Sequence, residues 1–287
     1  MAAPQVSWVL GLSRPPCPQL RPFVRTVWAT QAGPLPPSNA PSWRFERVLP
    51  TGLMHLVFRW SAQPLVVRYD AENNHPIELG HSLIGGARDT SYLRQLDPRS
   101  HSVGALLFAG TSTLLFGVRA GELAERHTNL DSLWSLTEVA ELRERMEAAH
   151  DAEARVAVLE RALLARLPRV HGLHPAVAEA LVRLSRSEPV SAVVERTGYS
   201  HRALISLFRD AVGLSPKAFS RIARFQRAIE RLNSDARPSL VEVATNAGYA
   251  DQAHFTREFT RITRMRPSVY RRANPEQCNH VPVGISR

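Results

Sequence analysis

The spacing of apolar residues changes along the chain and separates a strand-rich front from a helical remainder. From Phe23 to about Val118, short β-branched and aromatic clusters alternate with Gly- and Pro-rich turns. Several short strands at close spacing predict a β-sandwich or barrel. The predicted strands are Phe23-Val24, Val27-Trp28, Leu53–Trp60, Leu65–Tyr69 and Val103–Phe108. A surface loop is predicted at Pro34–Pro41.

Further along, the apolar period lengthens to that of a helix. Ser135-x-x-Glu138 is a capping-box pattern, and apolar residues recur at helical spacing from Leu136 to Met146. A second apolar stripe runs from Val156 to Leu167. Together they predict a helical hairpin over residues 131–168. Its apolar face either packs on the β domain, which we favour, or forms a dimer interface.

The last part of the chain contains an internal duplication. Val190–Phe219 and Leu240–Tyr270 share apolar, Gly and Tyr positions, first at an offset of 50 and then of 51. One residue is therefore missing from the first copy, within its second helix or at that helix's start. An amphipathic segment with four Arg, Ser220–Leu232, joins the copies. Pro168–Pro175 is predicted to be a linker, with Pro175 in the first turn of the next helix.

Each copy has the features of a helix-turn-helix unit. A short apolar-striped helix ends at Gly198 or Gly248, where a left-handed residue allows a sharp turn. Ser200 or Asp251 then caps the second helix. Two such units joined by a rigid helix suit successive major grooves on one face of DNA, about 34 Å apart.

The motifs of this region are G-Y-S followed by F-x-x-x-x-G-L-S-P in the first copy, and G-Y followed by F-T-R-x-F in the second. On these motifs, residues 174–274 resemble the AraC/XylS family of regulators, and the resemblance implies a seven-helix DNA-binding domain. One departure is Arg264, which stands where the first copy has Gly213. Arg264 is expected to strain the helix end or to contact a phosphate.

The front part resembles the cupin-like amino-terminal domain of some AraC-type regulators. The matching stretches are Arg47–Phe58, Val103–Leu123 and Leu130–Trp134. The middle stretch reads Ala109-Gly110 where those relatives often have Pro-Gly. The resemblance implies a small effector-sensing domain.

Charge supports nucleic-acid binding by the rear part. The chain has a formal net charge of +10. Residues 1–171 carry 18 Arg against 16 acidic residues, whereas residues 172–287 carry 17 Arg and one Lys against 10. A basic half beside a nearly neutral half is typical of a polyanion-binding domain joined to another domain.

Candidate base-reading residues lie on the outward flank of each second helix, where the resemblance also places the family's base contacts. They are His201, Arg202, Ile205, Ser206, Gln252, Ala253, Thr256 and Arg257. Gln pairs bidentately with adenine and Arg with guanine, so Gln252 and Arg257 are the best suited chemically. Ile205 and Ser206 can offer a base only a methyl contact or one weak hydrogen bond. The second copy should therefore discriminate between base pairs more sharply than the first. The candidate DNA-backbone contacts are Ser200, Arg221, Arg224, Arg261, Arg264, Arg271 and Arg272.

Other chemistry finds little support. Cys17 and Cys278 are too few for a disulfide framework or a zinc site, and suit a reducing cytosol. No signal peptide, membrane span, phosphate-binding loop or nucleophile elbow is recognised. The front histidines lack the H-x-H spacing of a cupin metal site. We therefore expect no metal, no cofactor and no catalytic activity. His55, Phe58 and Trp60 are candidates for an effector pocket.

These observations predict an α+β chain. Its parts are a β-rich, barrel- or cupin-like sensor (1–130), a hairpin (131–168), a tandem helix-turn-helix domain (174–274) and a flexible tail (275–287). The expected function is sequence-specific binding of double-stranded DNA in transcription regulation, in the cytoplasm. A small-molecule or protein effector of the front domain, RNA polymerase and a second copy of the chain are further expected partners. Two alternatives stay open: a cupin-type metalloenzyme with a DNA-binding tail, and a protein-interaction module with degenerate helix-turn-helix units.

Overall fold

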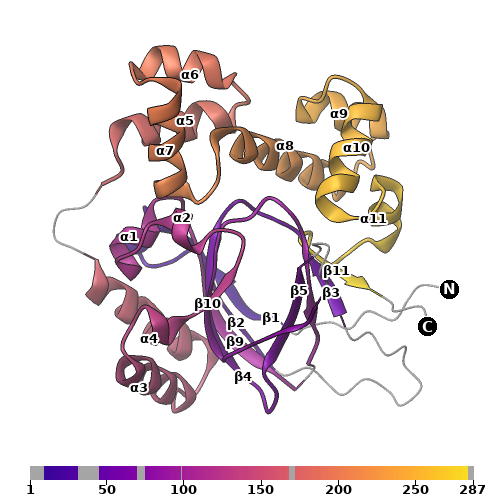
Figure 1. The fold of residues 1–287 in the computed structure, drawn as a ribbon. Coiled ribbons are helices and arrows are strands. Elements are labelled where there is room, and N and C mark those ends of the chain that lie inside the picture. The colour runs from indigo at the N-terminus through magenta and orange to yellow at the C-terminus, as the bar shows by residue number, and fades with distance from the viewer. Residues whose placement is uncertain (1–9, 32–44, 70–74, 98, 168–171, 284–287) are drawn as a thin grey trace.

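The structure is a computed structural model that describes residues 10–31, 45–69, 75–97, 99–167 and 172–283. Its front part is built from two antiparallel sheets that face each other (Figure 1). The six-stranded sheet, in spatial order, contains β1 (Leu10–Arg14), β2 (Val24–Thr30), β9 (His101–Leu107), β4 (Met54–Trp60), β7 (Ser82–Gly85) and β10 (His127–Asn129). The five-stranded sheet contains β11 (His280–Val283), β3 (Phe45–Val48), β8 (Tyr92–Gln95), β5 (Leu65–Tyr69) and β6 (Ile77–Leu79).

The prediction of a strand-rich front is confirmed, but the barrel is not. Among the described strands, hydrogen bonds pair the chain into two separate sheets and do not close them into one. The predicted loop at 34–41 lies outside the described residues. Two short helices that the sequence did not predict, α1 (Thr111–Phe116) and α2 (Ala120–Leu123), follow β9. Gly110 precedes α1 and Gly117 ends it, and both glycines have the left-handed conformation.

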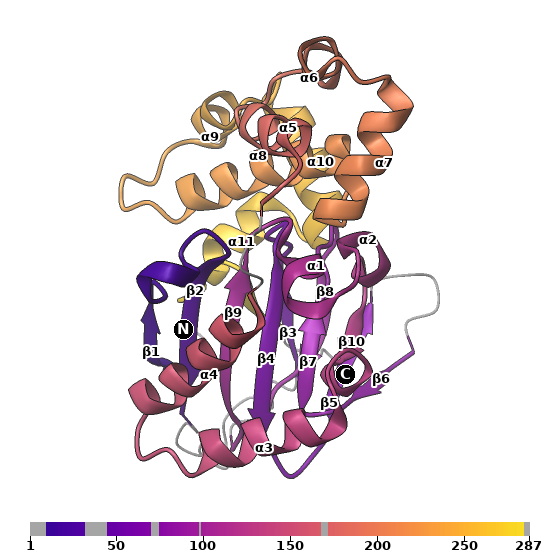
Figure 2. The same ribbon diagram turned by 90° about the vertical axis from the view of Figure 1, so that its left-hand side faces the viewer.

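The helical hairpin consists of α3 (Leu136–Glu147) and α4 (Ala152–Arg166), which lie across the outer face of the six-stranded sheet (Figure 2). The predicted capping box is present, since Ser135 and Glu138 each accept a hydrogen bond from the other's backbone amide. Val139, Leu142 and Met146 of α3 are buried in the core that also contains the strands, as are Val156, Leu159 and Leu163 of α4. Leu136, at the start of α3, is 70 % exposed. The hairpin therefore packs on the β domain, as we favoured.

Seven helices follow, and they form the helical part of the chain above the sheets in Figure 1. They are α5 (Pro175–Ser185), α6 (Val190–Thr197), α7 (His201–Val212), α8 (Pro216–Leu232), α9 (Leu240–Ala247), α10 (Gln252–Thr263) and α11 (Pro267–Ala273). Pro175 occupies the first turn of α5, as predicted. This mixed architecture, with a sheet-rich front and a helical rear, matches the predicted class.

The two parts share a core. One continuous cluster of buried residues runs from Leu20 in the front to Ala218 in the rear. At the contact, α2 packs against α7 so closely that a Cβ atom on Gly213 would lie 3.1 Å from the Ala120 carbonyl oxygen. The Gly110 amide also donates to the Ala211 carbonyl at 2.9 Å. The first half of the helical part is therefore packed directly on the β domain.

Polar contacts join the rest of the helical part to the loop between β7 and β8. Asp89 forms an ion pair with Arg221 of α8. Two residues later, the Ser91 amide donates to the carbonyl of Ile262 in α10 at 3.0 Å. One short loop thus contacts both α8 and α10.

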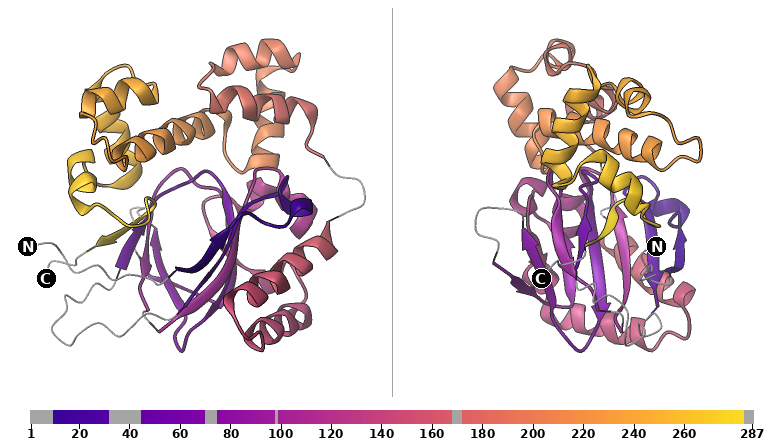
Figure 3. Two further views of the ribbon diagram at one scale, coloured as in Figure 1. Left: turned by 180° about the vertical axis from the view of Figure 1, so that it is seen from behind. Right: turned by 90° about the vertical axis from the view of Figure 1, so that its right-hand side faces the viewer.

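The end of the chain corrects the prediction of a flexible tail after residue 274. After α11 the chain turns back to the front domain, where β11 pairs with β3 (Figure 3). Val281 is 2 % exposed, and the Leu49 amide donates to the Asn279 carbonyl at 2.8 Å. The edge of β3 offers unpaired backbone groups, and the apolar Val281 gains burial by pairing there.

Val281→Ala tests this attachment. Because the side chain is buried, its truncation should lower the free energy of unfolding by about 2 kcal/mol in urea denaturation. Val269→Ala, at a 41 % exposed position of α11, is the matched control and should change it by less than about 0.5 kcal/mol. Equal, negligible effects of both substitutions would contradict the attachment.

Candidate nucleic-acid interface

The first helix-turn-helix unit is formed by α6 and α7. Gly198 ends α6 in the left-handed conformation, with φ of 69°, so the chain turns sharply without steric cost. Ser200 caps α7 by accepting a hydrogen bond from the Ala203 amide at 3.3 Å. The inward face of α7 buries Leu204 and Phe208, which leaves its outward flank for solvent or a ligand.

The second unit, α9 and α10, repeats this arrangement. Gly248 ends α9 with φ of 87°, and Asp251 caps α10 through the His254 amide at 2.6 Å. The first helices of the two units have 8 residues each and the second helices 12. The extra residue of the second copy therefore lies in the turn before α10, which agrees with the predicted position at the helix start.

The helix α8 holds the two units apart (Figure 1). At 17 residues it is about 25 Å long. Its apolar face buries Phe225 and Ile229 against α9 and α10. Arg227 connects neighbouring elements, since its guanidinium donates to the Ser185 carbonyl at 2.6 Å and the Ala247 carbonyl at 3.3 Å. Arg227 is thus a structural residue of the domain.

The predicted base-reading residues lie on exposed flanks of α7 and α10. His201, Arg202 and Ser206 are exposed in the first unit. Gln252, Ala253 and Arg257 are exposed in the second, whereas Ile205 and Thr256 are half-buried. The front domain leaves these flanks uncovered, so both remain accessible to a large ligand.

The predicted backbone contacts divide into two groups. Arg261, Arg264 and Arg272 are exposed, and Arg261 pairs with Glu258 one turn earlier on α10 at 3.4 Å. By contrast, Arg224 stacks its guanidinium 5.0 Å from the centre of the Tyr249 ring, and Arg271 donates to the Pro238 carbonyl at 2.7 Å. Ser200 uses its hydroxyl for the helix cap.

Arg221 differs most from its predicted role. It is half-buried, forms the ion pair with Asp89 and lies 4.0 Å from Glu258. A phosphate contact would require breaking that pair, so we no longer count Arg221 among the DNA contacts.

Arg264 occupies the strained position that its alignment with Gly213 predicts. Both residues end the second helix of their unit in the left-handed conformation, with φ of 57° for Arg264 and 86° for Gly213. A Cβ atom in this region is crowded by the following carbonyl, which glycine avoids. Arg264 is nevertheless exposed at the end of α10, where a guanidinium can reach a phosphate.

The three candidate effector residues do not line one pocket. Phe58 and Trp60 are buried beneath the helices, in the core that contains α3 and α4. Strand residues alternate between faces, and His55 therefore points the other way, into the space between the two sheets. Sequence spacing could have indicated this, since positions 55 and 58 differ by an odd number.

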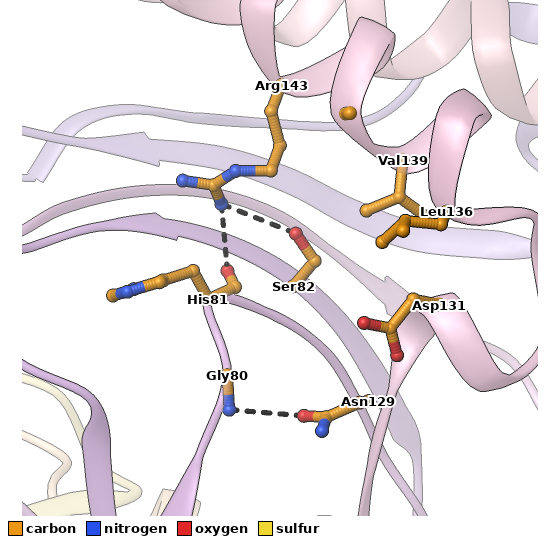
Figure 4. Close-up of a pocket in the computed structure, with 9 residues that line it drawn as sticks. Gly80, His81, Ser82, Asn129, Asp131, Leu136, Val139 and Arg143 are labelled. Atoms are coloured by element: carbon orange, nitrogen blue, oxygen red, sulfur yellow. Dashed lines mark hydrogen bonds between the residues drawn. The ribbon is translucent and has the colours of Figure 1, made fainter.

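Two hollows lie elsewhere, one in the front domain and one between the domains. A pocket of about 170 Å³ lies where α3 meets the turn before β7, and Arg143 donates there to the His81 carbonyl at 3.2 Å and the Ser82 hydroxyl at 3.3 Å (Figure 4). A larger, mostly apolar cleft of about 450 Å³ lies between the domains, lined in part by Leu53, Phe108 and Phe219. Within the described residues, no group of three His, Cys, Asp or Glu side chains is arranged to hold a metal ion.

Comparison with known proteins agrees with the geometry of the rear part. The helix-turn-helix domain family matches residues 193–273, and a domain of unknown function matches residues 13–129. The arabinose operon regulatory protein of Escherichia coli is 30 % identical over 139 residues, 45 % of this chain. The rear part is an AraC-type helix-turn-helix domain.

The match covers 47 % of the Escherichia coli protein, so the chain spans about half the length of that relative. Solved structures similar to the chain include the C-terminal domain of AraT from Geobacillus stearothermophilus, with 22 % identity and a TM-score of 0.34 over 37 % of this chain and 92 % of that one. Another is ToxT from Vibrio cholerae bound to an unsaturated fatty acid, with 10 % identity and a TM-score of 0.44. That match covers 85 % of this chain and 93 % of the ToxT chain.

Sequence reasoning missed the residues that attach the AraC-type domain to the front domain. Asp89 and Ser91 stand in a loop with no motif, and Arg221 lies 132 residues from its partner. A contact over that separation leaves no periodic or local signal.

Among the described residues, every helix is too short or too polar to span a bilayer.

The strain at Arg264 leads to a prediction. Arg264→Gly should raise the free energy of unfolding by about 0.5–1 kcal/mol, because relief of the left-handed penalty outweighs the added entropy of glycine in the unfolded chain. The matched control, Arg261→Gly within α10, should lower it by about 1 kcal/mol. Urea denaturation measures both, and a loss of stability in Arg264→Gly would contradict the assignment of strain.

Proposed function

We propose that the protein is a transcription regulator that binds specific double-stranded DNA through α7 and α10. The observation that carries this proposal is the presence of two helix-turn-helix units, at opposite ends of one rigid helix, each with an uncovered outward flank. The second helix of such a unit enters the major groove with its first turns toward the bases. Gln252 and Arg202 occupy those first turns.

The side chains on these flanks suit base recognition. Arg257 forms two parallel hydrogen bonds with guanine, and Gln252 does so with adenine. Arg202 serves the first unit, with His201 and Ser206 beside it. Arginines exposed next to the flanks, at 261, 264 and 272, lie where DNA phosphates would run. The second unit therefore provides most of the discrimination, and the first adds affinity and register.

The front domain is proposed to control these units. It packs against α7 and forms polar contacts with α8 and α10, so it contacts both units and the helix between them. A ligand that changes the front domain would change their relative placement. Such a cupin-like sensing role agrees with the resemblance of the front part. RNA polymerase contact and pairing of two copies complete the proposal as expected partners of a promoter-bound regulator.

Two alternatives make different predictions. A cupin-type metalloenzyme with a DNA-binding tail would retain stoichiometric zinc, iron or nickel after purification, which elemental analysis detects. A protein-interaction module would not select any DNA sequence. We propose that the protein is a regulator and not an enzyme, on the strength of its two helix-turn-helix units and the match of residues 193–273 to the helix-turn-helix domain family.

The test is selection of binding sites from random duplex DNA. The full chain is used, because the first unit shares its core with the front domain. Enrichment of a two-part motif of about 20 bp, with affinity that falls steeply as salt rises, is the expected result. If nothing is enriched and binding is weak at physiological salt, the regulator proposal fails.

Arg257→Ala should weaken binding to the selected site about tenfold or more and relax discrimination in one half of the motif only. The matched control is Arg145→Ala, which removes the same charge from an exposed position of α3. Gel-shift titration at fixed salt compares the two. An equal loss in both variants would mean that only net charge is being measured.

A further inference from the structure

The buried residues of the two helix-turn-helix units belong to separate clusters. The first cluster, which also contains the β domain, ends on α8 at Ala218, and the second begins on that helix at Ile222. Among the described residues, no continuous apolar core runs from one unit into the other. Within the helical part, the angle between the units therefore depends on α8 and on the contacts beside it.

Arg227 of α8 makes such a contact. Its Nη1 donates to the Ser185 carbonyl at 2.6 Å, and its Nη2 donates to the Ser187 hydroxyl and, at 3.3 Å, to the Ala247 carbonyl. Ser185 is the last residue of α5, which shares its core with α6 and α7. Ala247 is the last residue of α9 in the second unit. One guanidinium thus joins the two units.

The carbonyls that Arg227 binds lie at helix ends, where the helix itself supplies no donor. The last four carbonyls of a helix have no partner within it. The donor four residues after Ser185 would be Pro189, which has no N–H. A positive charge is also favourable at a helix C-terminus, and Arg227 lies at two of them. The site therefore favours a guanidinium over an uncharged side chain.

The two turns that Arg227 bridges lie directly against each other. A Cβ atom on Gly248, which ends α9, would lie 3.9 Å from the Arg227 Nη2 and 4.0 Å from the Ser187 hydroxyl. Both turns are left-handed, with φ of 87° at Gly248 and 65° at Ser187. A serine in this conformation is uncommon, because its Cβ atom is crowded. The hydrogen bond from Arg227 to the Ser187 hydroxyl helps to hold it there.

The front domain does not make this contact. Gln226, one residue earlier on α8, donates to the Pro50 carbonyl of the front domain at 2.7 Å and to the Asn279 side chain at 2.9 Å. The next residue lies about 100° further round the helix. All three acceptors of Arg227 belong to the helical part. Arg227 therefore adds a constraint between the units that their attachment to the sheets does not supply.

We propose that Arg227 is a positioning residue that fixes α10 relative to α7 and thereby sets the number of base pairs between the two halves of the DNA site. One added base pair shifts the second half by about 3.4 Å and turns it by about 35°. Two units held at a fixed angle cannot follow this change, whereas loosely joined units can. The consequence for DNA rests on the proposed function, but the link between the units does not.

The first experiment measures how binding depends on the spacing of the two half-sites. Gel-shift titrations of the full chain at fixed salt use the selected site and sites with one base pair added or removed between its halves. The wild type should lose at least about tenfold in affinity on either altered site, because the base contacts of one unit are lost. Arg227→Met should bind the selected site more weakly and lose less than about threefold on the altered sites.

This ratio separates positioning from stability. A smaller folded fraction would lower the affinity for all three sites by the same factor and would leave the spacing dependence unchanged. Base preference within each half of the site should also stay as in the wild type, because the residues of α7 and α10 that face the bases are intact.

The matched control is Arg231→Met, which removes the same charge from an exposed position one turn further along α8. It should keep the spacing dependence of the wild type. Ser187→Ala, which removes one of the three acceptors, should relax the dependence in the same direction as Arg227→Met by a smaller factor. No relaxation in either Arg227→Met or Ser187→Ala, or an equal relaxation in Arg231→Met, overturns the proposal.

A second measurement needs no DNA. Spin labels are attached to the exposed positions of α6 and α9 through Ser191→Cys and Val241→Cys, in a chain whose Cys17 and Cys278 are replaced by alanine. Pulsed electron paramagnetic resonance should give one narrow distribution of distances between the labels. The distribution should broaden or shift when Arg227→Met is added.

The two measurements distinguish failure of this proposal from failure of the regulator proposal. If the wild type selects no DNA sequence, the regulator proposal fails, and the distances between the labels decide whether Arg227 fixes the units. An unchanged distance distribution in Arg227→Met overturns the positioning role. A changed distribution with wild-type spacing dependence overturns the assignment of half-site spacing to Arg227.

Discussion

The arrangement of the molecule depends on the close packing of α2 against the end of α7. Gly213 ends α7 in a left-handed conformation, and the absence of its side chain lets Ala120 and Ala87 approach the helix. The core of the first helix-turn-helix unit therefore continues into the β domain. A unit whose core is completed by another domain has its orientation fixed by that domain, and α8 then carries this orientation to the second unit.

The two units differ in how they are held. The first is held by apolar packing, which is insensitive to salt and geometrically strict. The second is held by hydrogen bonds and an ion pair through the loop that contains Asp89 and Ser91, and by the β11 attachment, and its core also includes the buried front-domain residue Leu49. Polar contacts exchange more readily with water and ligands than a packed core does. The polar contacts at the Asp89–Ser91 loop are therefore the part of the attachment that exchanges most readily, and one of them is made to α10, the helix that carries Gln252 and Arg257.

Local signals in the sequence predicted the local structure well. The left-handed glycines at 198 and 248, the caps at Ser200 and Asp251, and the capping box at Ser135 all depend on neighbouring residues, and each formed as predicted. The exposure of the base-reading candidates followed from the same helical spacing. Long-range contacts were not predictable in this way. The Arg221–Asp89 pair and the docking of Val281 depend on residues brought together only by the tertiary fold.

The pairing of β11 with β3 has a consequence for the freedom of the DNA-binding domain. The chain enters this domain from the hairpin and, after leaving it, is bound to the front domain again, so the domain is a segment closed at both ends. Closure of a loop removes configurations that a domain tethered at one end would sample. A released α10 would remain at high effective concentration near its contacts and would rebind quickly. A conformational change of this domain is therefore restricted to small displacements, because both of its ends are attached to the front domain.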